Sequence, residues 1–481
     1  MLSTHNLKLI INGTAAIERA DLRLARGEKV GFIGRNGSGK STLLSALAAH
    51  AGGLELPEHA SLEGDIVFDN LASVIFVPQE WHDVPDATVA EYLDDGVREI
   101  PGSIVALRLG ELSGGWLKFV QLAKAIGSGA DALLLDEPTN NLDAEHTDLF
   151  IDMLQRSTLA VLIVSHDRYA LDKTVAAIYE INSSTREVRR YNGNYTSYKT
   201  EKDKELQAQE RDFEVQNKRR KRLTESLGEL SAKADRIQTE TKHFYYRKRA
   251  AKLGMRAAHQ RERVESELSA VAHPQFDKPL KFAVRNADKS KNGLTLVTVK
   301  GADFAYGIKL AFSHLSLTVR SGERVQITGC NGSGKSTLLR LIGTGDLPTM
   351  GNIETFGRVG YLPQVSNVQE PKISVARYLE KTIGCTQAES GSMVGRVLLK
   401  NPENMSVGEL SEGELKKLWL AVLLAGGYDV LVLDEPTNHL DVYAIEALEK
   451  ALDEFSGTVI FASHDRRFAE KVRTTEPFSV T

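Results

Sequence analysis

Short apolar runs recur along the chain, and each one stops at a glycine or a small polar cluster. In the first part these runs are GEKVGFIG (27–34), VIFVPQ (74–79), ALLLDE (132–137) and VLIVSH (161–166). Runs that are apolar throughout, separated by helical patterns, are typical of parallel strands buried on both faces. The pattern predicts an α/β fold in which ligands bind at the carboxyl ends of the strands.

The same series of runs returns in the second part of the chain. Gly34 has its counterpart at Gly329, an offset of 295, whereas Glu137 and His166 have theirs 298 residues later, at Glu435 and His464. The offset is also 298 for the serines Ser113 and Ser411, so it is constant over three motifs, which indicates an internal duplication. We therefore predict two tandem domains, residues 1–197 and 279–481.

The segment between them, 198–278, has a different pattern. Apolar residues recur at spacings of four and three, which is typical of a helix that packs against another helix. No proline occurs between Pro138 and Pro274. We predict an antiparallel helical hairpin whose arms, about thirty residues each, extend roughly 45 Å. The expected apolar seams are Leu223, Leu227, Leu230, Ala234 and Ile237 in the first arm and Ala250, Leu253, Ala257 and Val264 in the second.

This linker concentrates the basic charge of the chain. Residues 216–261 hold fourteen Lys or Arg against four Asp or Glu, a net charge of +10, so the remainder of the chain, with −4 overall, carries −14. Cations beside aromatic rings suit RNA, because the rings stack on bases and the cations pair with phosphates. A charged helical spacer is the alternative interpretation. The residues expected to face RNA or tRNA near the turn are Lys242, His243, Phe244, Tyr245, Tyr246, Arg247, Lys248 and Arg249.

Length, composition and cysteine number indicate the number of domains and the cellular compartment. With 481 residues, 42% of them hydrophobic, the chain is long enough for two or three domains with ample cores. Two cysteines are too few for a disulfide framework, and no secretory signal or long membrane-spanning apolar run is apparent. We expect a soluble cytoplasmic protein with reduced thiols and no membrane partner.

Both domains contain a glycine-rich phosphate-binding loop between a strand and a helix. Its backbone N–H groups surround an anion, its lysine reaches the β- and γ-phosphates, and its serine ligates Mg²⁺. ATP and Mg²⁺ are thus the predicted cofactors. The candidate residues are Gly34, Asn36, Gly37, Gly39, Lys40, Ser41 and Thr42 in the first domain, and Gly329, Asn331, Gly332, Gly334, Lys335, Ser336 and Thr337 in the second.

Polar groups at the other strand ends supply candidate hydrolytic chemistry. Asp136 can hold Mg²⁺ through water, Glu137 can deprotonate the attacking water, and His166 can sense the γ-phosphate. Gln79 ends another strand and is a further candidate for metal binding and catalysis. The second domain repeats these residues as Asp434, Glu435, His464 and Gln364.

Together, the phosphate loop, the glutamine, LSGG at 112–115, DEPTN at 136–140 and SHD at 165–167 resemble ATP-binding-cassette ATPases. Two cassettes in one chain, joined by a charged helical linker, resemble the F type (ABC-F). That resemblance implies ribosome binding near the tRNA exit site, with the linker directed at the P-site tRNA, the large-subunit rRNA and the peptidyl-transferase centre.

The resemblance also implies two composite ATP sites formed head to tail, so that the chain acts as a monomer containing its own cassette dimer. One site would combine the phosphate loop, glutamine, carboxylates and histidine of the first cassette with Ser411 and Gly413. The other would combine those of the second cassette with Ser113 and Gly115. Ser113 is also expected to cap a helix.

Some positions depart from the family pattern. Trp116 replaces the usual glutamine of the first signature, and Glu412 replaces a glycine of the second. Because Glu412 would lie near phosphates, we expect a weaker or slower first site. Tyr306 is placed to stack on adenine, whereas its counterpart is Ile11, so adenine should bind more tightly in the second site.

The intervals from glutamine to signature serine, 34 and 47 residues, leave no room for the arm that housekeeping members often insert in the first cassette. Lack of an arm resembles the group that protects ribosomes from antibiotics, which is our preferred hypothesis. The alternatives are a translation factor that rescues stalled ribosomes without any drug and the ATPase subunit of a drug exporter. DNA is not an expected partner, because related DNA-end-binding proteins have zinc-binding cysteines or a far longer coiled coil.

Overall fold

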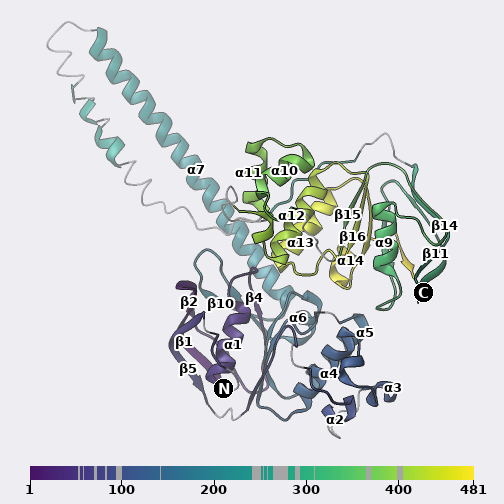
Figure 1. Cartoon of the computed structure of the whole chain (residues 1–481). Helices are drawn as coiled ribbons and strands as arrows, with labels where there is room; N and C mark the ends of the chain where they lie inside the picture. The colour runs from purple at the N-terminus through teal and green to yellow at the C-terminus, as the bar shows by residue number, and fades with distance from the viewer. Residues whose placement is uncertain are drawn as a thin grey trace. The chain divides into compact units, whose positions relative to one another are not determined.

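Two predominantly parallel sheets, one from each half of the duplicated sequence, carry the strand ends identified above (Figure 1). The structure is a computed structural model that describes residues 1–52, 55–57, 59–69, 73–81, 84–93, 100–140, 142–240, 251–252, 254–256, 258–263, 280–287, 293–307, 309–364, 370–397 and 405–480. It contains two compact units, which are Met1–Tyr195 with Asp277–Thr481, and Thr196–Phe276.

The sheet of the first cassette has six strands in the order β10-β9-β4-β8-β7-β6. All its pairings are parallel except that of β10 with β9. Its central strands are buried along their whole length, as expected when helices cover both faces. The strands are β4 (Lys29–Ile33), β6 (Val74–Val77), β7 (Ala132–Asp136), β8 (Ala160–Val164), β9 (Ala177–Ile181) and β10 (Val188–Asn192).

A second, antiparallel sheet in this cassette centres on β1, which pairs with β2, β3 and β5. Its strands are β1 (Leu2–Ile11), β2 (Thr14–Ala20), β3 (Arg23–Leu24) and β5 (Ala60–Phe68). The helices are α1 (Lys40–His50), α2 (Val89–Leu93), α3 (Gly102–Val105), α4 (Gly114–Gly127), α5 (Ala144–Arg156) and α6 (Arg168–Thr174).

The second cassette repeats this arrangement. A parallel sheet has the order β15-β16-β17-β13-β18, and an antiparallel sheet has the order β12-β11-β14. The strands are β11 (Thr295–Tyr306), β12 (Lys309–Arg320), β13 (Arg324–Thr328), β14 (Met350–Thr355), β15 (Val359–Leu362), β16 (Val430–Asp434), β17 (Thr458–Ala462) and β18 (Glu476–Ser479). The helices are α9 (Lys335–Thr344), α10 (Val375–Ile383), α11 (Gln387–Val397), α12 (Glu412–Ala425), α13 (Val442–Glu454) and α14 (Arg466–Lys471).

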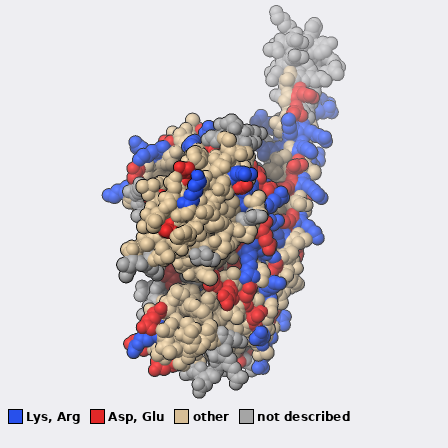
Figure 2. Space-filling view, turned by 90° about the vertical axis from the view of Figure 1, so that its right-hand side faces the viewer, with Lys and Arg blue, Asp and Glu red and all other residues tan. Residues whose placement is uncertain are grey.

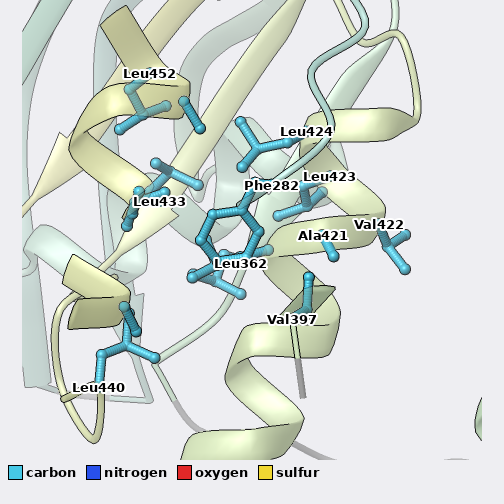
Figure 3. Packing of buried hydrophobic residues seen from close by; sticks show 14 of the residues in the cluster. Phe282, Leu362, Val397, Ala421, Val422, Leu423, Leu424, Leu433, Leu440 and Leu452 are labelled. Atoms are coloured by element: carbon cyan, nitrogen blue, oxygen red, sulfur yellow. The ribbon is translucent and has the colours of Figure 1, made fainter. Parts of the chain in front are cut away.

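The core of the second cassette extends to the chain that enters it from the linker. Phe282 is 8% exposed and packs in the apolar cluster that includes Leu362, Leu424 and Leu433 (Figure 3). The Arg285 amide also donates to the Leu424 carbonyl at 2.8 Å. Residues 280–285 are therefore part of the cassette.

The same residue types begin equivalent helices in both copies. Asp143 caps α5 and Asp441 caps α13, each accepting from the amide three residues later. Ser113 caps α4 by accepting from the Trp116 amide, as predicted, and Ser411 caps α12. A side-chain acceptor at this position satisfies an amide that has no partner within the helix.

The linker unit contains one long helix, α7 (Tyr195–Glu240), of 46 residues. The predicted first arm is therefore helical, and residues 254–256 and 258–263 of the second arm are helical as well. Lys and Arg side chains follow the exposed surface of α7 (Figure 2). The predicted apolar seam and the RNA-facing residues 242–249 lie outside the residues whose side chains are described. Among the described helices, none combines the length and apolar character needed to cross a membrane.

Gly343 allows α9 to pack closely against β15. A Cβ at this position would lie 2.4 Å from the Tyr361 ring, so we expect Gly343→Ala to destabilise the second cassette by about 1–3 kcal/mol through overpacking. Thermal unfolding of the variant should show a lower midpoint. Gly391→Ala, in α11 where nothing lies within 4 Å of the added carbon, is the matched control and should leave the midpoint unchanged or raise it. Equal midpoints for the two variants would contradict the packing argument.

Candidate functional site

The two phosphate loops have the same backbone conformation at the start of their helices. Gly39 and Gly334 occupy the N-cap positions of α1 and α9 with φ of 94° and 95°. This left-handed region favours glycine, and at Gly334 a Cβ would also lie 2.8 Å from the Ala311 carbonyl oxygen. The loops thus present backbone amides at a helix N-terminus, where an anion is stabilised.

The predicted lysines and metal-binding pairs lie together in each loop. The Lys40 ammonium donates to the Gly34 carbonyl at 2.8 Å, and the Lys335 ammonium donates to the Gly329 carbonyl at the same distance. Ser41 and Ser336 each donate to a carboxylate at 3.1 Å, which belongs to Asp136 in the first cassette and to Asp434 in the second. A hydroxyl and a carboxylate oxygen this close fit the oxygen ligands that Mg²⁺ prefers.

The carboxylates proposed for hydrolysis have an unusual backbone. Glu137 and Glu435 both have φ of 45°, an uncommon conformation for a residue with a side chain, and such strain clusters at functional sites. Each amide is held by the neighbouring strand, from Val164 and Ala462 respectively. In this conformation each carboxylate contacts the histidine of its own cassette.

The contacts between glutamate and histidine repeat almost identically. The His166 amide donates to Glu137 Oε2 at 3.1 Å, and its Nε2 lies 3.4 Å from Oε1. In the second cassette the corresponding distances between His464 and Glu435 are 3.2 and 3.5 Å. Oε1 of Glu137 is buried without a hydrogen-bond partner among the described residues, so its capacity to accept a hydrogen bond is unused.

Burial shifts the protonation equilibria of the first site. It raises the pKa of Glu137 to about 8, because the charged form is poorly solvated and Asp136 is close. It also lowers the pKa of His166 to about 3, with the Lys40 and Lys417 charges acting in the same direction. With this lowered pKa, His166 is neutral at physiological pH. In the second site, burial and the neighbouring Glu435 raise the pKa of Asp434 to about 6.

The remaining predicted residues are arranged around these groups. Gln79 and Gln364 are exposed just beyond β6 and β15. A Cβ on Gly413 would lie 2.7 Å from Asn36 Nδ2 of the first cassette, so the second signature lies against the first phosphate loop. Gly115 of the first signature is buried. Of the residues predicted for the first composite site, the structure thus brings Gly413 of the second cassette next to Asn36 of the first phosphate loop.

The predicted adenine-stacking residue lies beside the second phosphate loop. Tyr306 is 56% exposed, and its hydroxyl is 3.2 Å from Thr337 Oγ1, directly after Ser336. Its ring is thus available to a base next to the loop. In the first cassette Ile11 lies against the loop, 3.5 Å from the position of a Cβ on Gly39.

Two lysines that the motifs did not identify also belong to the sites. Lys118 in α4 donates to the Pro78 and Gln79 carbonyls at 2.7 and 3.1 Å, and Lys416 in α12 donates to the Glu435 carbonyl. Burial lowers the pKa of each to about 8. The two are related by the duplication offset of 298, and that relation could have revealed them.

Arginines that follow the histidines join the cassettes. Arg168, which is 4% exposed, pairs with Glu449 and lies 3.3 Å from Asp465. Its counterpart Arg466 pairs with Asp148 at 2.6 Å. Each arginine therefore reaches a carboxylate of the opposite cassette, next to a proposed nucleotide site.

Comparison with known proteins identifies the family. Residues 17–140 and 312–438 match the family described as "ABC transporter". The chain is 30% identical, over 98% of its length and 85% of the relative, to "Ribosome protection protein VmlR" of Bacillus subtilis (strain 168). It is also 30% identical, over 96% of its length and 77% of the relative, to "Probable ATP-binding cassette sub-family F member 3 homolog" of Encephalitozoon cuniculi. The chain belongs to the ABC-F ATPases.

Another relative of this ABC-F ATPase is the "Energy-dependent translational throttle protein EttA" of Haemophilus influenzae, with 30% identity over 93% of the chain and 86% of the relative. A solved structure of an archaeal ribosome recycling factor, aABCE1, with the stalk protein aP1 aligns with a TM-score of 0.64 and 20% identity. The alignment covers 98% of this chain and 87% of the other. The two proteins share the tandem-cassette fold.

The raised pKa of Glu137 predicts a pH-dependent stability of the ABC-F chain without nucleotide. Between pH 4.5 and about 8 the folded protein retains a proton that the unfolded chain releases, so stability falls as pH rises through this range. Glu137→Gln removes this cost. Its thermal midpoint should exceed that of the wild type by on the order of 5 °C at pH 8.5, with a smaller difference at pH 6. Glu145→Gln, at an exposed position in α5, is the control, and a difference independent of pH would contradict the burial argument.

Proposed function

We propose that this ATPase binds the ribosome in its ATP-bound, closed form and directs its basic linker toward the P-site tRNA and the peptidyl-transferase centre, protecting the ribosome from antibiotics. The observation that carries the proposal is that Gly413, in the second signature, lies against Asn36 of the first phosphate loop, as expected for a composite ATP site. A γ-phosphate bound there would contact both cassettes, so closure would depend on ATP and would be reversed by hydrolysis. In this proposal Mg²⁺ is held by the Ser41–Asp136 and Ser336–Asp434 pairs.

The charge of α7 supports an RNA partner. Residues 218–222, KRRKR, are exposed on this helix, within a chain whose net charge is −4. A basic segment on an otherwise acidic protein gives a local attraction to phosphates that does not require recognition of base sequence. The resemblance to VmlR and EttA, whose names state ribosome protection and translational throttling, agrees with the ribosome as the RNA assembly.

A translation factor that acts without a drug is the second candidate, supported by the similarity to EttA. The two candidates share ribosome binding and differ in one measurement. Expression of a protection factor raises the inhibitory concentration of antibiotics that act at the peptidyl-transferase centre or exit tunnel. Expression of a drug-independent factor leaves that concentration unchanged. Retention on membranes after a high-salt wash would instead favour the exporter subunit.

The clamp is tested by removing both proposed bases. Glu137→Gln with Glu435→Gln should lower kcat for ATP by on the order of 100-fold or more, because water activation is lost while the phosphate loops remain intact. The variant should sediment with ribosomes in ATP and much less in ADP. Adding Lys40→Ala and Lys335→Ala gives the control, which should lose sedimentation in ATP because phosphate binding is removed. Sedimentation that is the same in ATP, in ADP and without nucleotide would contradict the proposal.

The linker is tested by its charge. Replacing the five basic residues 218–222 with Gln in the trapped variant should weaken ribosome binding. The slope of log affinity against log salt should become shallower by roughly 0.7–0.9 for each phosphate that the protein no longer neutralises. Lys300, Lys372 and Arg377, exposed on the second cassette, provide the control when changed to Gln. If both sets of substitutions weaken ribosome binding by the same amount per charge removed, the proposal that α7 contacts RNA is contradicted.

A further inference from the structure

A buried ion pair in the second cassette borders the first composite site. Lys417 of α12 donates to Asp441 Oδ2 at 2.7 Å, and the two residues are 7% and 1% exposed. The Asp441 carboxylate also caps α13 through Oδ1 and accepts the Asn36 amide of the first cassette on Oδ2 at 3.2 Å. These three contacts compensate the buried charge of the carboxylate and link it to both cassettes.

Asn36 connects Asp441 to His166 of the first site. Its Nδ2 donates to the His439 carbonyl of the second cassette at 2.7 Å, which fixes which end of the amide is the oxygen. Oδ1 consequently faces His166 Nε2 at 3.2 Å, so the imidazole must donate from Nε2. That same Nε2 lies 3.4 Å from Glu137 Oε1. A continuous series of polar contacts thus runs from Lys417 in one cassette to Glu137 in the other.

A second contact from the same region strengthens the connection. The Tyr443 hydroxyl donates to Glu180 of the first cassette at 2.6 Å, and the Arg35 guanidinium lies over the Tyr443 ring, 5.9 Å from its centroid. Arg35 precedes Asn36 in the phosphate loop. The N-cap residue Asp441 and the first turn of α13 therefore contact two successive residues of the loop, Asn36 and Arg35.

The second composite site differs at the equivalent positions. Phe119 occupies the place of Lys417, and Asp143, the counterpart of Asp441, pairs with His146 at 2.6 Å within its own cassette. Glu145, the counterpart of Tyr443, and Asn331, the counterpart of Asn36, are both exposed. Among the described residues, the Lys417–Asp441 pair at the first site therefore has no counterpart at the second site.

We propose that Lys417 is a positioning residue for ATP hydrolysis in the first site: by holding Asp441 against the Asn36 amide, it sets the orientation of Asn36, His166 and Glu137. The proposal rests on the assignment of Glu137 as the base of that site. Hydrolysis in the first cassette then requires the second cassette to be docked, because part of the alignment of its base comes from the partner. The second site does not depend on Lys417.

The test separates the two sites with the glutamate variants. In purified Glu435→Gln protein, where only the first site hydrolyses, Lys417→Met should lower kcat on the order of tenfold or more while KM for ATP changes less than about threefold. In purified Glu137→Gln protein, where only the second site hydrolyses, the same change should leave kcat within about twofold. Lys417→Arg should restore most of the activity of the first site, because it retains the charge. These assays use no ribosomes.

Two further variants keep the result interpretable. Lys417→Met with Asp441→Asn removes both buried charges and retains a helix cap, so it should fold even if the single variant does not, and it should still lower kcat of the first site. If neither the Glu435→Gln protein nor the Glu137→Gln protein hydrolyses ATP measurably, Lys417→Met and Lys417→Arg are made in the otherwise wild-type chain. There, Lys417→Met should lower kcat and Lys417→Arg should retain most of it. Full activity of Lys417→Met in Glu435→Gln protein, or an equal loss in both backgrounds, would overturn the proposal. Undiminished hydrolysis after Glu137→Gln is added to Glu435→Gln would instead overturn the assignment of the base.

Discussion

A charged side chain that is buried needs a partner of opposite charge or a hydrogen bond. This constraint explains the polar contacts between the two cassettes beside the proposed nucleotide sites. Arg168 is buried between carboxylates of the opposite cassette, and Asp441 is buried between Lys417, its own helix and a backbone amide across the interface. Removing one partner would leave an uncompensated charge in a poorly solvated place. These hydrogen bonds and ion pairs therefore favour one arrangement of the two contacting cassette surfaces. An apolar contact would be less specific, because it is not directional.

The duplication supplies two similar backbones, but their side chains have diverged. Strand ends, helix caps, strained glutamates and Ser–Asp pairs recur at nearly the same distances in both cassettes. Several of the residues that differ lie around the caps of α5 and α13, where His146 and Trp116 in one copy take the places of Ala444 and Glu414 in the other. The chemistry common to both sites is thus built from the shared geometry. Differences between the sites arise from the contacts that support it.

Much of this organisation could be predicted from the sequence, because the relevant signals are local. A glycine loop between strand and helix, or two carboxylates directly after an apolar run, has the same meaning wherever it occurs, and the duplication supported each pattern by repeating it. Ser113 was predicted as a helix cap for the same reason, and the structure confirms it. The two-cassette fold and the ATPase activity followed from these patterns.

The residues that could not be predicted are those whose partners are distant in sequence. Arg168 and Glu449 are 281 positions apart, and nothing in either local sequence indicates the other. The pairing of Lys417 with Asp441 depends on how α12 lies beside the turn before α13, which is a property of packing rather than of pattern. Lys118 and Lys416 each resemble an ordinary surface lysine of an amphipathic helix, and before their burial is seen only their shared offset of 298 distinguishes them.

The first residue of α7 has a mechanical consequence. Tyr195 lies at the carboxyl end of the first cassette, and its hydroxyl donates to Glu446 of the second cassette at 2.9 Å, so this residue is held by both cassettes. A change in the position of either cassette that alters this hydrogen bond would therefore act directly on the residue from which the 46-residue helix begins.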